Sequence, residues 1–172
     1  MKKFLKKSMI CFFVMFMVSA TVSSFAQPIQ VEASVKSAKA VKQARKCYYT
    51  TQKNLRKYKR ISNGSGCIDY WNGNHLALSV IKPAKGNILA ISGTVCEYYY
   101  AGRRLSFAFA YKKKGRKVKE YRAYYMGDKC YRYIGPDKKV HTYGSGKKQS
   151  RMPKMAKQLY FKGTYNLHFV YD

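Results

Sequence analysis

The spacing of hydrophobic residues changes along the chain, from a helical period near the N-terminus to a strand period in the middle. Residues 36–59 are rich in alanine and lysine, and Val41, Tyr48 and Leu55 recur every seven positions. This spacing places the three side chains on one face of a helix. The sequence therefore predicts a helix over much of residues 36–59, ended by the loop residues 63–66 (NGSG).

Residues 68–134 carry the pattern that is typical of antiparallel strands joined by tight turns. The runs 68–71 and 75–81 flank Asn72-Gly73, a dipeptide that favours the type I′ turn of a hairpin. Further strand-like runs are separated by glycine-containing or basic turns and lie at residues 88–100, 105–111, 118–126 and 129–134. The middle of the chain therefore predicts an antiparallel meander.

The clearest strand covers residues 105–111, where large residues alternate with Ser106, Ala108 and Ala110. One face of this strand is large and aromatic, and the other face is small. We expect the N-terminal helix to pack on the small face, because small side chains let a helix approach the sheet closely.

The end of the chain is predicted to hold a short helix. Residues 150–153 (SRMP) are typical of a helix start, Gly163 of a C-terminal stop, and residues 164–171 alternate weakly, as in a last strand. Together these elements predict an α+β fold. Its N-terminal helix packs on an antiparallel β-meander of about six strands, and a short C-terminal helix follows.

The first 26 residues have the parts of a secretory signal peptide. Four lysines precede the uncharged run 9–18 (MICFFVMFMV), which is too short to cross a bilayer as a helix of about 20 residues. Small residues suited to cleavage occur at Ser24-Phe25-Ala26 and again at Val31-Glu32-Ala33. We predict a signal peptide at 1–26, a leader or linker at 27–35 and a single α+β domain at 36–172, in a secreted or cell-wall-associated protein.

Positive charge dominates the composition. The chain has 35 Lys and Arg against 7 Asp and Glu, a formal net charge of +28, which removal of residues 1–26 would lower to +24. Such an excess attracts polyanions. Lysine outnumbers arginine in the basic runs, which favours salt-sensitive and weakly selective contacts over bidentate recognition.

Two basic runs are the candidate binding sites. Residues 36–60 contain ten basic residues and no acid, and a second run occupies residues 112–119. We expect the first run to contribute more, because lysines on a flexible loop lose more entropy on binding than lysines on a helix. The predicted polyanion-binding residues are Lys53, Arg56, Lys57, Arg60, Lys112, Lys113, Lys114 and Lys117.

Four cysteines remain after removal of Cys11 with the signal peptide: Cys47, Cys67, Cys96 and Cys130. An even number in an exported protein makes them disulfide candidates. We expect a Cys47–Cys67 bridge, which would close a loop of about 20 residues and stabilise the fold by about 3 kcal/mol. The alternative for Cys96 and Cys130 is burial as free thiols on strands. The spacings lack Cys-x-x-Cys, and neither a metal site nor a cofactor is predicted.

Three tyrosine-rich or aromatic motifs follow one another in the strand region: Glu97-Tyr98-Tyr99-Tyr100, then Leu105-x-Phe107-x-Phe109, then Glu120-Tyr121-Arg122-x-Tyr124-Tyr125. With these motifs the region resembles a group of small, largely uncharacterised bacterial secreted proteins and lipoproteins. The resemblance covers about residues 50–135 and implies tyrosine-rich strands that pair through glycine-containing turns. It implies no activity, and the strong positive charge departs from the group.

The candidate chemistry favours binding over catalysis, and no catalytic residue is predicted. The cysteines lack the local motifs of nucleophiles, and the strand acids Glu97 and Glu120 are more readily read as partners of lysine and arginine than as a glycosidase pair. The strand tyrosines suit sheet packing, with base or sugar stacking as the alternative reading. The candidates for stacking are Tyr98, Tyr100, Tyr124, Tyr131 and Tyr133.

The sequence therefore predicts a secreted, non-enzymatic binding module that adheres to anionic polymers at or outside the cell surface. The polymer could be a cell-wall polymer, an anionic lipid surface, a glycosaminoglycan or extracellular DNA, without recognition of a specific nucleic acid. Peripheral contact with a membrane is compatible with this prediction. Two alternatives stay open: a secreted protein ligand or inhibitor that uses exposed tyrosine faces, and a Cys- or Glu-dependent hydrolase.

Overall fold

The computed structural model describes residues 28–63, 65–143 and 151–171. Eight strands form one sheet in which every neighbour is also the next strand along the chain, and every pair is antiparallel. The elements are α1 (Pro28–Asn54), the 3₁₀ helix η2 (Leu55–Lys57), β1 (Lys59–Asn63), β2 (Cys67–Asn72), β3 (His75–Ile81), β4 (Val95–Tyr100), β5 (Leu105–Lys114), β6 (Lys117–Met126), β7 (Lys129–Ile134), β8 (Val140–Thr142) and α3 (Lys154–Tyr171).

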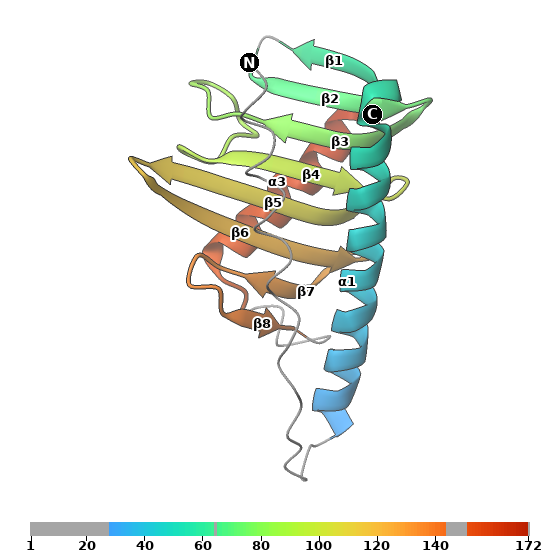
Figure 1. The fold of residues 1–172 in the computed structure, drawn as a ribbon, viewed down its shortest axis with the longest axis vertical. Coiled ribbons are helices and arrows are strands. Elements are labelled where there is room, and N and C mark those ends of the chain that lie inside the picture. Colours follow the sequence, from blue (N-terminus) through green and yellow to red (C-terminus); the bar gives the residue numbers. More distant parts are fainter. Residues whose placement is uncertain (1–27, 64, 144–150, 172) are drawn as a thin grey trace.

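The predicted α+β class is confirmed: the N-terminal helix packs on an antiparallel meander, and a C-terminal helix follows (Figure 1). The meander has two strands more than expected, because β1 and β8 extend it at its two edges. The predicted signal peptide at residues 1–26 lies outside the described residues. The predicted leader is helical from Pro28, so α1 has 27 residues. Among the described helices, none is long and apolar enough to cross a membrane.

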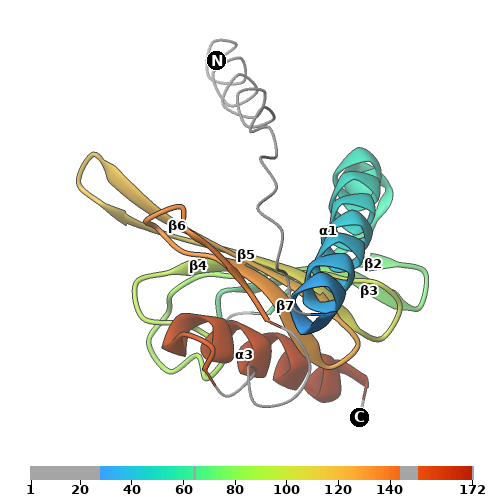
Figure 2. The same cartoon turned by 90° about the horizontal axis from the view of Figure 1, so that it is seen from below.

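The two helices lie on opposite faces of the sheet (Figure 2). Helix α1 packs on the aromatic face, where Ala44 joins a cluster with Leu78, Tyr99 and Phe107. The prediction that it covers the small-residue face is wrong. The reason lies in α1 itself, whose buried side chains are small and therefore fit against large rings: Ser37, Ala40, Ala44 and Thr51.

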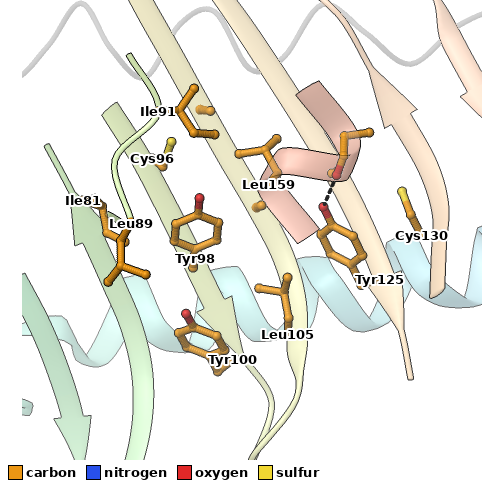
Figure 3. Packing of buried hydrophobic residues seen from close by; sticks show 14 of the residues in the cluster. Ile81, Leu89, Ile91, Cys96, Tyr98, Tyr100, Leu105, Tyr125, Cys130 and Leu159 are labelled. Carbon is orange, nitrogen blue, oxygen red and sulfur yellow. Dashed lines mark hydrogen bonds between the residues drawn. The ribbon is translucent and has the colours of Figure 1, made fainter. Parts of the chain in front are cut away.

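Helix α3 covers the small-residue face, where Leu159 packs in one cluster with Tyr98, Leu105 and Ala108 (Figure 3). It is a single helix of 18 residues, so the predicted stop at Gly163 and the predicted last strand at 164–171 are wrong. Gly163 sits in the buried face of the helix. There the absence of a side chain lets the helix backbone approach the sheet.

The strongest turn prediction is confirmed. Strands β2 and β3 form a hairpin whose last paired residues are Asn72 and His75, and Gly73 in the turn has φ of +57°. Asn-Gly supplies the left-handed backbone that this tight turn needs.

Candidate polyanion interface

The basic run at residues 112–119 forms the far end of a long hairpin made by β5 and β6. The two strands pair without interruption from Phe107–Tyr124 to Lys114–Lys117. The hairpin extends well beyond the rest of the sheet (Figure 2), and its residues 112–120 are all exposed. The segment predicted as a flexible basic loop is therefore mostly paired strand, so the entropic reason for ranking it below the α1 run does not hold.

The register of this hairpin sets lysines directly opposite each other. Lys112 faces Lys119, and Lys114 faces Lys117. Because side chains alternate along a strand, all four point to the same face of the hairpin. Directly opposed side chains lie about 5 Å apart at Cβ, where like charges are destabilising. We call Lys112, Lys114, Lys117 and Lys119 the lysine quartet.

The sequence prediction found part of this quartet. It included Lys113, which lies opposite Val118 on the other face of the hairpin, and it left out Lys119. The strand register decides membership, and the charge run alone does not reveal it. Lys112 also reaches the neighbouring loop, where its Nζ donates a long bond of 3.5 Å to the Ser92 carbonyl.

The second predicted group does not lie on one helix face. Lys53 is in the last turn of α1, Arg56 and Lys57 are in η2, and Arg60 is in β1. All four are exposed. The α1 end lies beside β1 and β2, whereas the tip of the β5–β6 hairpin lies at the far end of its strands (Figure 1). The structure therefore makes two separate basic surfaces of the predicted residues.

The described acidic side chains are mostly engaged within the protein. Asp69 is buried and accepts a hydrogen bond of 2.5 Å from the Ser79 hydroxyl. Glu120 forms an ion pair of 2.7 Å with Arg122, and Asp137 accepts from the Lys139 backbone N–H at 3.2 Å. These carboxylates therefore do little to neutralise the hairpin lysines.

A buried polar network joins α3 to the sheet. The Asn166 side chain donates to the Ser79 Oγ at 2.8 Å and to the Tyr100 Oη at 3.4 Å, and Tyr100 donates to the Gly163 carbonyl at 3.1 Å. Burial raises the pKa of the Asp69 carboxyl, and the hydrogen bond from Ser79 opposes this rise. The network is closed off from solvent, so its role is to orient α3.

Glu97 and Glu120, the carboxylates of the alternative glycosidase reading, both lie on the face of the sheet that α1 covers. Glu97 accepts a 2.6 Å bond from Tyr99, whose Oη in turn accepts from Gln52 at 2.8 Å, and burial raises the pKa of Glu97. Glu120 lies two strands away and two residue pairs further along the sheet, where it is held by Arg122. Each carboxylate is thus turned to its own partner.

Other chemistry-bearing residues are dispersed. Among the described residues, no group of His, Cys, Asp and Glu is placed to hold a metal ion. A depression of about 430 Å³ on the surface is lined by residues that are neither Cys, His nor carboxylates: Pro83, Ala84, Lys85, Asn87, Ala90, Ser92 and Gly93.

The predicted Cys47–Cys67 disulfide is wrong, because the two thiols lie on opposite faces of the sheet. Cys47 packs with the α1 cluster, Cys67 belongs to the α3 cluster, and no disulfide joins any of the four described cysteines. Cys67 and Cys96 both pair with Ile81 from opposite sides. Two strand spacings put them about 9.6 Å apart, beyond the roughly 7 Å that a disulfide spans between Cα atoms.

The strand tyrosines mostly pack inside the protein. Of the five stacking candidates, Tyr98, Tyr100, Tyr131 and Tyr133 are buried, and Tyr124 is half-buried against Phe107 at 5.0 Å between ring centres. The buried rings are closed to a ligand. Comparison of the chain with protein-family models, characterised proteins and solved structures finds no match.

Proposed function

We propose that this protein is an exported, non-enzymatic module that binds anionic polymers at the cell surface, and that the lysine quartet of the β5–β6 hairpin is its main contact. The observation that carries the proposal is the pair of opposed lysines, Lys112–Lys119 and Lys114–Lys117. A strand pair gains stability from opposite charges at such positions and loses it from like charges. An anionic ligand would remove that repulsion on binding.

The shape of the hairpin supports the same function. The quartet sits on paired backbone at the end of a projecting element, so a long polymer can reach it without entering a cleft (Figure 2). The charges are lysines, which attract anions without fixed geometry. We expect binding that is tolerant of polymer chemistry and sensitive to salt.

The test compares three variants that remove the same number of charges. In the first, the lysine quartet is changed to Gln. In the second, Lys53, Arg56, Lys57 and Arg60 are changed to Gln. In the third, a dispersed control, the exposed residues changed to Gln are Lys39, Lys42, Lys85 and Lys129.

Retention on heparin resin is measured against salt concentration, and circular dichroism confirms that each variant folds. We expect the quartet variant to elute at a lower salt concentration than the dispersed control. Coincident elution of all three variants would mean that only total charge matters. If the wild type is not retained at all, the polyanion-binding proposal is wrong.

A further inference from the structure

The outer face of α3 carries a row of exposed aromatic residues that the fold does not use. Phe161, Tyr165 and Phe169 are spaced four residues apart, so they line one side of the helix. Their exposed fractions are 59%, 41% and 70%, and the first two rings stack with centres 5.9 Å apart. We call these three residues the outer aromatic stripe.

The stripe is not part of the core. The helix buries its opposite face against the sheet through Ala156, Leu159, Gly163, Asn166 and Leu167. The three exposed rings therefore lie on the side of α3 that is turned away from the sheet. Ile88, 62% exposed, adds apolar surface at the edge of the stripe, where Lys162 Nζ donates to the Ile88 carbonyl. Exposed apolar surface of this kind marks an interaction site.

Positive charge flanks the outer aromatic stripe at its N-terminal end. Residues 151–171 include no acid, and Lys154 and Lys157 on the same helix are exposed. The Nζ of Lys162 lies 5.7 Å from the centre of the Phe161 ring. A helix face that combines exposed aromatic rings with neighbouring lysines matches the interface of an anionic bilayer, where rings enter the headgroup region and lysines meet the phosphates.

We propose that the outer aromatic stripe docks on an anionic lipid bilayer, with α3 lying along the membrane surface. The proposal rests on the proposed function in one respect, because the positive charge that attracts polymers also draws the protein to anionic lipid. It adds a second contact on a different element, since the lysine quartet lies at the end of the β5–β6 hairpin and the outer aromatic stripe lies on α3. The rings supply the part of the affinity that salt does not screen.

A bilayer fits the outer aromatic stripe better than a second copy of the chain. Two copies joined through this face would bring two strongly basic chains together, which costs electrostatic energy. Three partly exposed rings also supply much less than the roughly 800 Å² per partner that a stable protein interface buries. A fluid lipid surface needs no matching groove.

The test measures binding of the full chain to sedimented vesicles of equal parts phosphatidylglycerol and phosphatidylcholine. Vesicles of phosphatidylcholine alone serve as the uncharged comparison. The stripe variant carries Phe161→Gln, Tyr165→Gln and Phe169→Gln, which keep good helix formers at exposed positions. The control variant carries Tyr49→Gln, Val118→Gln and Val140→Gln, which replace residues with exposed fractions of 61%, 53% and 50% elsewhere on the surface.

We expect the wild type and the control to stay bound to the anionic vesicles at about 0.5 M NaCl, where charges are screened beyond about 4 Å. The stripe variant should bind roughly tenfold more weakly there, because burial of its rings is lost. It should keep wild-type retention on heparin resin, and this separates failure of the lipid contact from failure of the proposed polymer binding.

Three results would overturn the lipid proposal. Equal vesicle binding by the stripe variant and the wild type would show that the rings do not meet lipid. Complete release of the wild type by salt would show that charge alone holds it. Absence of vesicle binding would assign the stripe to another occupant: a second copy if the wild type sediments as a dimer and the stripe variant does not, and otherwise a protein partner.

Discussion

Gly163 of α3 lies so close to Tyr98 of β4 that a side chain at this position has no room. A Cβ atom built on Gly163 would be 2.7 Å from Tyr98 Cδ1 and 2.9 Å from Leu105 Cδ2. Both neighbours are buried, so neither can turn away into solvent. The glycine therefore sets how near the helix comes to the sheet.

Replacing Gly163 with alanine should destabilise the protein by about 1–2 kcal/mol. Overpacking of a core destabilises the folded state by about 1–3 kcal/mol. The higher helix propensity of alanine offsets up to about 1 kcal/mol of this loss. Urea unfolding followed by circular dichroism measures the change. In a Tyr98→Ala background, where the nearest obstacle is gone, the same replacement should cost less or become stabilising. An equal cost in both backgrounds would show that the contact is not the cause.

Gly163 also explains where prediction from sequence failed. A glycine near the end of a helical pattern reads as a stop, because its usual role there is to cap the helix. Its actual role depends on Tyr98, 65 positions earlier in the chain, which no local pattern reveals. With the stop misplaced, residues 164–171 read as a strand, and the spacing of Phe161, Tyr165 and Phe169 on one helix went unnoticed.

The other predictions from sequence also succeeded where the information is local and failed where it depends on distant parts of the chain. The Asn72-Gly73 hairpin was predictable because its turn chemistry lies in the dipeptide. The face on which α1 packs and the pairing of Lys112 with Lys119 depend on partners far along the chain and on strand register. Periodicity therefore gave the class of fold and the basic segments, but it did not give the members of the lysine quartet.

The four cysteines should all be free in the purified protein. Alkylation after unfolding without reductant, followed by mass spectrometry, should label Cys47, Cys67, Cys96 and Cys130. In the folded protein the reaction should be slow, because burial raises the pKa of Cys47 and Cys96 to about 11 and of Cys130 to about 12, so the reactive thiolate is scarce. Fewer than four labels on the unfolded chain would contradict the arrangement of thiols on separate faces and distant strands.

The buried Asp69 should make stability depend on pH in a defined direction. Because burial raises its folded-state pKa, the folded protein holds this proton more tightly than the unfolded chain. Stability from this group is therefore full below its unfolded pKa and falls as pH rises through its folded pKa. Asp69→Asn keeps an oxygen to accept from Ser79 and removes the titration.

The measurement is the free energy of unfolding of Asp69→Asn relative to the wild type, from about pH 3 to pH 7. We expect the free energy of unfolding of the variant to increase relative to that of the wild type as pH rises. The exposed Asp128, changed to Asn, serves as the control and should show no such gain. A relative loss of stability with rising pH would mean that the Asp69 carboxylate is better accommodated in the folded state than its burial implies.

The lysine quartet should link stability and binding in opposite directions. Lys119→Glu turns the like-charged pair with Lys112 into an opposite-charged pair. At low salt this change should stabilise the protein by about 0.5–1 kcal/mol, and the gain should shrink as salt screens the exposed pair. The same change should lower the salt concentration at which the protein elutes from heparin resin, because it removes one of the four positive charges on this face of the hairpin.

Lys129→Glu is the matched control, since it makes the same change of charge at an exposed strand position whose cross-strand neighbour is Met126. It should weaken heparin retention less and should gain no stability from a cross-strand pair. Thermal unfolding and resin elution, each measured at several salt concentrations, test both properties on the same samples. If Lys119→Glu lowers the stability of the protein at low salt, the opposed lysines do not destabilise the hairpin. Repulsion between the opposed lysines would then not account for polyanion binding, even if total charge still governs retention.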